Sequence, residues 1–126
     1  MAEVRPVVSS IAHKDTIKIL DNQTINPSSE YSVNLEVPYG KTGVALTVQA
    51  TYDASASKGI KIEVYWSPDG TNYDTDTDEV YTHPFSAGAT KQKTYVIQCV
   101  HPHLRIKVVN EDSSYGVTVN AWVTYI

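Results

Sequence analysis

Apolar and polar side chains alternate along most of the chain, and the clearest alternation runs from Ile60 to Trp66. Every second residue in this segment is large and apolar, and the residues between them are Lys61, Glu63 and Tyr65. Because successive side chains of a strand point to opposite faces, the pattern predicts a strand with one buried face. This strand is the feature around which we expect the other strands to pack.

The predicted strand ends at a turn, Ser67-Pro68-Asp69-Gly70. Proline favours the first central position of a β-turn, and glycine tolerates the positive φ that such turns often require. The turn leaves Trp66 at the end of the strand and on its apolar face. We therefore predict that Trp66 is a core residue.

The same alternation, interrupted by turn-forming residues, predicts further strands. They are Thr16 to Leu20, Tyr31 to Val37, Val44 to Tyr52, Val80 to Thr82, Gln92 to Cys99, Leu104 to Val108 and Val117 to Ile126. The first of them is expected to end at the turn formers Asp21-Asn22. No segment keeps a period of about 3.6 long enough for a helix.

About seven or eight strands separated by turn signals are typical of a β-sandwich or jelly roll. The sequence therefore predicts an all-β fold: an antiparallel β-sandwich, jelly-roll-like, formed by one domain over residues 16–126. Residues 1–15 lack a clean period, and we expect them to form an extended N-terminal arm.

The last predicted strand carries large apolar residues on both faces. Trp122 and Ile126 share a face with threonine and asparagine, opposite Val119 and Val123. Such a strand is either covered on both sides or exposes a contact surface for another subunit. We predict that Trp122 and Ile126 lie at a subunit interface; the alternative is that the chain itself covers them.

Composition excludes several classes of protein. The chain has 126 residues and a formal net charge of −4, and its basic residues are scattered, which argues against nucleic-acid binding. No run approaches the roughly 18 apolar residues of a membrane-spanning helix, and the N-terminus lacks the apolar core of a signal peptide. We expect synthesis in a host cytoplasm without export. The single cysteine, Cys99, excludes an internal disulfide and is expected to be a small buried apolar residue.

An acidic loop is the first candidate for chemistry, because alternate aspartates can converge on Ca²⁺. Its calcium-ligand candidates are Asp74, Asp76 and Asp78. The EF-hand spacing fails, since Glu79 stands where glycine is needed and Phe85 where the last glutamate is needed. We expect a solvated loop and no cofactor.

The histidines form the second metal candidate. His101 and His103 are two positions apart, so on a strand they would share a face, with His83 as a third ligand. Closed zinc sites use four ligands, and Pro102 interrupts the segment, so we do not predict a metal here.

No nucleophile, phosphate-binding or metalloprotease motif is present in the sequence, and we expect no enzymatic activity. Tyrosines are plentiful, however, and exposed aromatic rings can stack on sugars or fill an interface. Tyr65 and Tyr73, with Trp122, are the candidates for ligand stacking. The alternative for the tyrosines is packing within the sheets.

Several segments together resemble a loose group of small phage and prophage structural proteins. These proteins carry a YSPDG-N-(Y/W)-D turn after a central strand and a final strand of V-x-V-x-A-W type. The matching segments, between Ile17 and Ile126, are LDNQTI, VYWSPDGTNYDT, AGATKQKTYVIQ, HLRIKVVN and VTVNAWVTYI. The resemblance implies a β-sandwich virion component, such as a capsid decoration protein or tail-associated module, usually oligomeric. The S-P-D-G turn also occurs in sugar-binding β-sandwich domains.

We therefore expect a non-enzymatic virion protein that forms a homo-oligomer, with a trimer as the preferred stoichiometry, and binds a viral capsid or tail protein. The alternative is a carbohydrate- or receptor-binding module with a glycan ligand. Neither nucleic-acid binding nor membrane insertion is expected.

Overall fold

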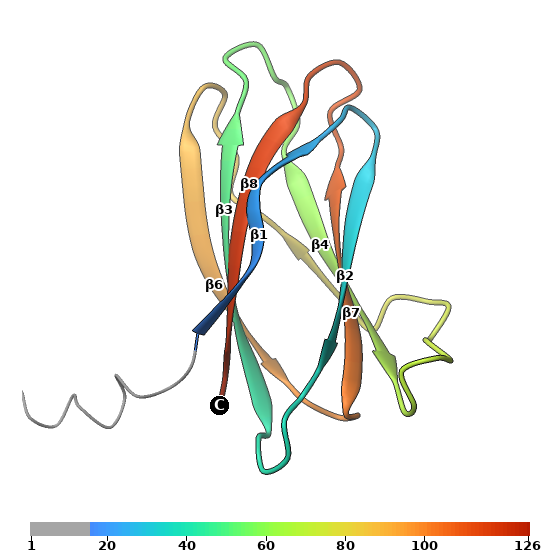
Figure 1. Cartoon of the computed structure of the whole chain (residues 1–126). Coiled ribbons are helices and arrows are strands. Elements are labelled where there is room, and N and C mark those ends of the chain that lie inside the picture. The colour runs from blue at the N-terminus through green and yellow to red at the C-terminus, as the bar shows by residue number, and fades with distance from the viewer. Residues whose placement is uncertain (1–15) are drawn as a thin grey trace, which may run out of the picture.

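Eight antiparallel strands form a two-layered sandwich in a computed structural model, which describes residues 16–126 (Figure 1). The strands are β1 (Thr16–Ile25), β2 (Glu30–Glu36), β3 (Gly43–Tyr52), β4 (Ile60–Ser67), β5 (Glu79–Thr82), β6 (Thr90–Gln98), β7 (His103–Asn110) and β8 (Val117–Tyr125). The predicted all-β sandwich is confirmed. The predicted N-terminal arm lies outside the described residues.

Each sheet has four strands, in the orders β1-β8-β3-β6 and β2-β7-β4-β5. The chain crosses from one sheet to the other at every connection except β4 to β5. Eight strands wound between two sheets in this way form a jelly roll. The crossings gather the β2–β3, β4–β5 and β6–β7 loops at one end of the sandwich (Figure 1).

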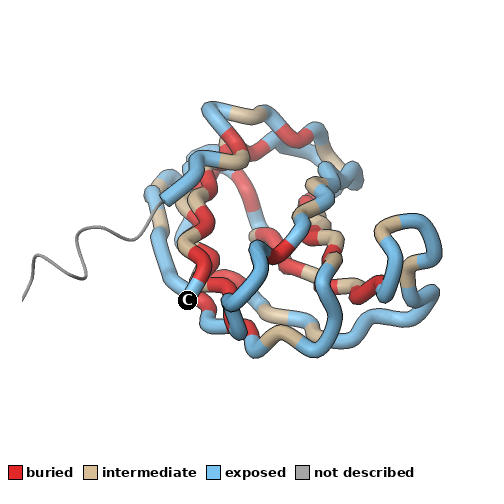
Figure 2. Tube along the Cα trace, turned by 60° about the horizontal axis from the view of Figure 1, so that its bottom comes forward, coloured by how far each residue is buried: buried red, intermediate tan, exposed pale blue. Residues whose placement is uncertain are grey.

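The core fills the space between the two sheets. The inner strands β3, β4, β7 and β8 bury alternate residues, as the period-two pattern predicts (Figure 2). Trp66 retains 3% of its exposure, so its predicted place in the core is confirmed. Cys99 follows β6 and packs against the edge of the core. It is half-buried, so the prediction that it is buried was wrong.

The first strand departs from the sequence prediction. Asp21-Asn22 do not end it: β1 continues to Ile25, and its pairing with β8 shifts register twice, between Lys18 and Leu20 and between Leu20 and Gln23. Asn22 has a positive φ of 49°, and its backbone N–H donates to Asn120 Oδ1 at 2.7 Å. The turn-forming residues make bulges because β8 supplies partners on both sides of them.

No helix within residues 16–126 is long and apolar enough to span a membrane.

Candidate functional site

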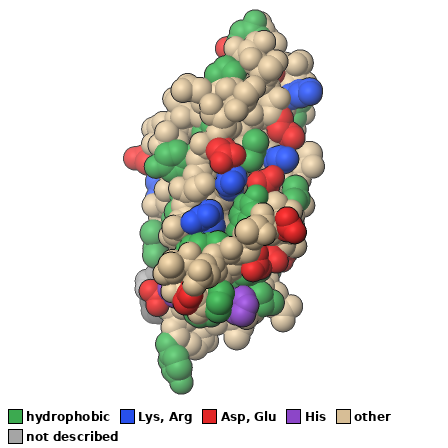
Figure 3. All heavy atoms as spheres, turned by 90° about the vertical axis from the view of Figure 1, so that its right-hand side faces the viewer, with side chains coloured by type: hydrophobic (Ala, Val, Ile, Leu, Met, Phe, Trp, Pro, Cys, Tyr) green, Lys and Arg blue, Asp and Glu red, His purple; other side chains and the backbone are tan. Residues whose placement is uncertain are grey.

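The outer face of the β2-β7-β4-β5 sheet interleaves charged and aromatic side chains. The outward positions of β4 and β7 hold Lys61, Glu63, Tyr65, Arg105 and Lys107. Figure 3 looks onto this side of the molecule, where acidic, basic and hydrophobic groups adjoin one another. Because the same strands bury their other face in the core, these side chains stand on a rigid base.

A cavity of about 270 Å³ opens on this face, next to the loop between β4 and β5. Its lining residues are Tyr65, Tyr73, Asp74, Thr75, Arg105 and Lys107. Tyr65 and Arg105 are direct neighbours across the β4–β7 pair, and they form part of its floor. Tyr73, Asp74 and Thr75 come from the loop and form a wall.

The turn after β4 determines where Tyr73 lies. Ser67 Oγ accepts hydrogen bonds from the backbone of Asp69 and Gly70, at 3.3 and 2.9 Å. The Asp69 carboxylate accepts from Thr71 N at 2.9 Å and from Asn72 N at 2.8 Å. These backbone donors hold the pKa of Asp69 well below its usual range. The turn motif therefore fixes the loop rather than supplying a reactive carboxylate.

Backbone hydrogen bonds then return the loop to β4. Asp74 N donates to Trp66 O at 2.9 Å, and Asp78 N donates to Val64 O at 2.8 Å. The Asp78 carboxylate in turn accepts from Trp66 N at 2.9 Å. Both sides of the loop are thus tied to the strand beneath the cavity.

Arg105 is positioned without a carboxylate partner. Its Nε donates to Asn34 Oδ1 at 2.9 Å, and its guanidinium carbon lies 4.1 Å from the centre of the Tyr73 ring. The ion pairs found within residues 16–126 involve Lys18, Lys61 and Lys107, but not Arg105. A half-buried guanidinium therefore faces the cavity with its terminal N–H groups available to an anion.

Tyr65 is held by its neighbours on the sheet. Its hydroxyl donates to Glu63 at 2.6 Å, and this hydrogen bond, with partial burial, raises the pKa of Tyr65 to about 12. Burial alone would raise the pKa of Glu63, but the hydrogen bonds from Tyr65 and Lys61 lower it. Lys107 Nζ lies 5.0 Å from the Tyr65 ring centre and 3.3 Å from Glu30.

The proposed calcium ligands do not assemble into a metal site. Among residues 16–126, no three His, Cys, Asp or Glu side chains converge in a metal-binding cluster, and Asp74, Asp76 and Asp78 therefore form none. The neighbouring side chain of Asp78 is the main cause of a raised pKa of Asp74.

The candidate histidines are separated. His83 is buried, with Nδ1 at 2.6 Å from the Tyr95 hydroxyl and Nε2 at 2.9 Å from the Lys91 carbonyl. His103 packs against Gly70, while His101 lies in the β6–β7 loop. His83 is therefore a satisfied core residue, in which burial is the main cause of a lowered pKa.

The outer face of the β1-β8-β3-β6 sheet holds Trp122 and Ile126. Trp122 is half-buried, with Lys18 Nζ 5.3 Å from its ring centre, and Ile126 keeps 37% of its exposure. The side chain of Ile126 packs over Gly43, where an added Cβ would lie 2.9 Å from it. Both predicted interface residues thus lie on the outer face, and no described segment of the chain covers them completely.

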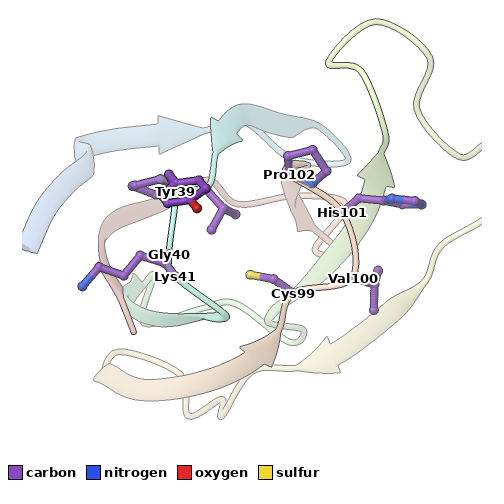
Figure 4. A pocket seen from close by; sticks show the side chains of 9 residues that line it. Tyr39, Gly40, Lys41, Cys99, Val100, His101 and Pro102 are labelled. Carbon is purple, nitrogen blue, oxygen red and sulfur yellow. The ribbon is translucent and has the colours of Figure 1, made fainter.

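A second cavity, of about 310 Å³, lies at the end of the sandwich between the β2–β3 and β6–β7 loops (Figure 4). Cys99, Lys41 and His101 are among its lining residues, and Tyr39 beside it is fully exposed. Burial raises the pKa of the Cys99 thiol, so this cysteine is not activated as a nucleophile.

Sequence reasoning found the tyrosines of the first cavity but missed its cations. Arg105 and Lys107 look like ordinary solvent-facing positions of an alternating strand. Only the pairing of β7 with β4 brings Arg105 next to Tyr65. The positions of Tyr65 and Tyr73 in the sequence do not indicate that Arg105 and Lys107 lie beside them.

The sequence of the chain is related to that of an archaeal protein. No family model matches the sequence. The chain is 32% identical over 114 residues to an uncharacterized protein of Methanocaldococcus jannaschii, MJ0346, with 90% of this chain and 98% of that protein covered. It belongs to the same family as this archaeal protein.

Solved structures with the same fold include viral proteins. The enzymatically active domain of bacteriophage CBA120 tailspike protein 4 has a TM-score of 0.61 at 9% identity, covering 90% of this chain and 18% of that one. The VP2 subviral particle of infectious bursal disease virus has a TM-score of 0.52 at 12% identity, covering 89% of this chain and 32% of that one. The chain thus spans less than a third of either protein, and the likeness shows a shared β-sandwich.

Proposed function

We propose that the protein is a non-enzymatic structural component of a virion, as a capsid decoration or tail-associated protein. It assembles with copies of itself, as a trimer, and binds a viral protein lattice. The observation that carries this proposal is the outer face of the β1-β8-β3-β6 sheet, which is almost free of charge.

Polar side chains on this face bond to one another in rows that run across the strands. One row joins Asn22, Asn120, Gln49 and Gln92 through side-chain contacts of 3.1 to 3.2 Å. Threonine pairs at 2.8 to 3.0 Å continue the pattern, and they are Thr16–Thr124, Thr47–Thr94 and Thr51–Thr90. Side chains fixed in this way lose little conformational entropy when another surface covers them.

An apolar strip crosses the same face. Val96 on β6 keeps 68% of its exposure and lies opposite Ala45 on β3. Ala45 is diagonal to Trp122, whose partner on β3 is Thr47, and Ile126 lies at the end of the sheet. Apolar side chains that are grouped and at least partly exposed in this way are typical of a contact surface.

A second copy of the chain fits this face better than a charged partner does. The only ion pair on it joins Lys18 and Asp21 at 2.8 Å, among the described residues. Copies of this face can therefore adjoin one another around a three-fold axis without like-charge repulsion, whereas the outer face of the other sheet is charged. The jelly-roll fold shared with a tailspike domain and a capsid protein supports a place for the assembly in a virion.

The mass of the protein in solution tests the proposal. We expect light scattering to give an oligomer at micromolar concentration. Val96→Glu introduces a charge at a site exposed in the subunit, so it is expected to yield a folded monomer. Trp122→Ser combined with removal of residues 1–12 is expected to do the same.

Val80→Glu is the matched control, since Val80 is also exposed but lies on the outer side of the other sheet. It should leave the oligomer intact. A wild-type protein that is already monomeric at micromolar concentration would overturn the assembly proposal. The second candidate, a carbohydrate- or receptor-binding module, would then take first place because of the cavity beside Arg105.

A further inference from the structure

We infer that the cavity lined by Tyr65, Tyr73, Asp74, Thr75, Arg105 and Lys107 binds an acidic sugar, a hydroxylated ring that carries a carboxylate. This function goes beyond assembly, because the site lies on the sheet opposite the proposed subunit contact.

Arg105 supplies the recognition of the carboxylate. Asn34 Oδ1 accepts a hydrogen bond from Arg105 Nε at 2.9 Å, and this bond fixes the plane of the guanidinium. The guanidinium carbon also lies 4.1 Å from the centre of the Tyr73 ring. The terminal N–H groups have no carboxylate partner within residues 16–126. A planar guanidinium with two free N–H groups matches the two oxygens of a carboxylate.

Lys107 adds a second positive charge to the cavity. It lies on β7, on the same face as Arg105, and its pairing with Glu30 at 3.3 Å leaves it partly neutralised. The site therefore has one cation without an acidic partner, Arg105, and one that is paired with Glu30, Lys107. Such a site suits a ligand with a single negative group better than a polyanion.

Aromatic and hydroxyl-binding groups surround the cations. Tyr65 is held by Glu63 at 2.6 Å and Tyr73 by Arg105, so both rings are fixed before a ligand arrives. Rigid aromatic rings provide contact area at low entropic cost. Asp74 and Thr75 provide oxygens at the rim that accept hydrogen bonds from hydroxyl groups.

Asp74 narrows the class of ligand. The Asp74 carboxylate repels a bare anion such as phosphate and so weakens its binding. It can accept hydrogen bonds from the hydroxyl groups of a ligand, so a ligand that carries both hydroxyls and one negative charge is favoured. Uronic acids and sialic acids combine both groups on one ring. A cavity of about 270 Å³ is near the lower limit of ligand pockets, roughly 300 Å³, and suits one ring at a time.

Calorimetric titration of the full-length protein with matched glycan pairs tests the inference. The probes are 3′-sialyllactose against lactose, and galacturonic acid against galactose, each at millimolar concentration. We expect at least one acidic member to bind about tenfold or more tightly than its neutral counterpart, as loss of charge-assisted hydrogen bonds implies.

Variants locate the binding. Arg105→Gln is expected to weaken acidic-sugar binding about tenfold or more, and Arg105→Lys to restore little of it, because lysine lacks the planar fork. Lys58→Gln removes a positive charge from an exposed loop outside the cavity and should leave binding unchanged. NMR gives an independent readout: the chain has two arginines, Arg5 and Arg105, and only the Arg105 Nε–H resonance should shift with ligand.

Several results would overturn the inference. They are equal affinity for the acidic and neutral members of both pairs, no binding of either acidic glycan, and equal competition by sodium phosphate or acetate. Binding of a hexaglutamate peptide without binding of the acidic sugars would assign the site to an acidic protein segment instead. The oligomeric state of Arg105→Gln, measured by light scattering, separates failure of this site from failure of the assembly.

Discussion

Single residues stabilise this sandwich in two ways. Apolar side chains are buried in its core, and a buried carboxylate accepts backbone hydrogen bonds at one end. Trp66 packs inside the core, next to the turn after β4. At the opposite end, Asp112 is buried and accepts hydrogen bonds from the backbone of Ser57, Ser114 and Tyr115, each at 2.8 Å. It therefore ties the β3–β4 connection to the β7–β8 connection.

Trp66→Ala is expected to lower the free energy of unfolding by about 3–5 kcal/mol, because truncation of a large core aromatic removes apolar contacts and leaves a cavity. Urea denaturation measures this loss. Val80→Ala, an exposed apolar truncation, should change the value by less than about 0.5 kcal/mol. An unchanged urea midpoint for Trp66→Ala would mean that Trp66 is not part of the core.

Asp112→Asn is expected to alter how stability depends on pH. Hydrogen bonds from the backbone of Ser57, Ser114 and Tyr115 hold the pKa of Asp112 well below its usual range. A carboxyl with a depressed pKa in the folded state stabilises the protein above its unfolded pKa, about 4, and this contribution is lost as the pH falls further.

The melting temperatures of wild type and Asp112→Asn should therefore differ most at neutral pH and converge below about pH 4. Asp76→Asn removes a charge from an exposed loop and serves as the control. A difference between wild type and Asp112→Asn that is constant from pH 7 to acid would contradict the role of the ionised carboxylate.

Among the elements, the β4–β5 loop is the one that builds a site. Its first turn is closed by Ser67 and Asp69, and Gly70 adopts a φ of 79°. A Cβ on Gly70 would lie 2.9 Å from His103 Nδ1 on β7. The turn thus requires glycine both for its backbone conformation and for its approach to the neighbouring strand.

Gly70→Ala and Gly40→Ala separate these two requirements. Gly40 also has a positive φ, of 85°, but nothing lies within 4 Å of an added Cβ. Gly40→Ala is expected to cost about 1–2 kcal/mol of unfolding free energy, from the backbone conformation alone. Gly70→Ala should cost more, and adding His103→Ala should recover the excess. If Gly70→Ala and Gly40→Ala lose the same unfolding free energy, the approach of the added methyl group to His103 does not reduce stability.

Calcium is not expected to support this loop, because its aspartates do not converge in a cluster within the described part of the chain and the Asp78 carboxylate already accepts a hydrogen bond from Trp66 N. EDTA should leave the melting temperature within about 2 °C, the change expected when no ligand stabilises the folded state. A larger decrease that added calcium reverses would assign Asp74, Asp76 and Asp78 to a metal site.

The whole molecule has two unlike outer faces. One carries the rows of Thr, Asn and Gln with Trp122, and the other carries Lys, Arg, Glu and Tyr. Assembly and ligand binding can therefore occupy opposite sides of the same sandwich. The two interactions should also differ in their response to salt, because only the second depends on charge.

The oligomer is expected to keep its mass when the salt concentration rises from about 0.05 to about 0.5 M, since screening acts on charged contacts. Binding of an acidic sugar at Arg105 should weaken over the same range. Light scattering and calorimetry measure the two effects on one protein. Dissociation of the oligomer at high salt would mean that charged groups hold the subunits together.

Much of the fold was predictable from the sequence. The alternation in β3, β4, β7 and β8 identified the strands and their buried faces, because side chains of a strand alternate whatever the strand pairs with. Trp66 and the turn after it were predictable for the same local reason. The end of β1 was not, since Asp21-Asn22 form bulges only where β8 continues the ladder beside them.

The sequence by itself determined most of the strands and the core position of Trp66, both of which follow from local periodicity and turn chemistry. Tertiary structure alone decided which strands are neighbours. The pairing of β4 with β7 joins Tyr65 to Arg105, and the pairing of β3 with β8 joins Gln49 to Asn120. Such pairs depend on the register between segments distant in the chain, and no local pattern of side chains encodes that register.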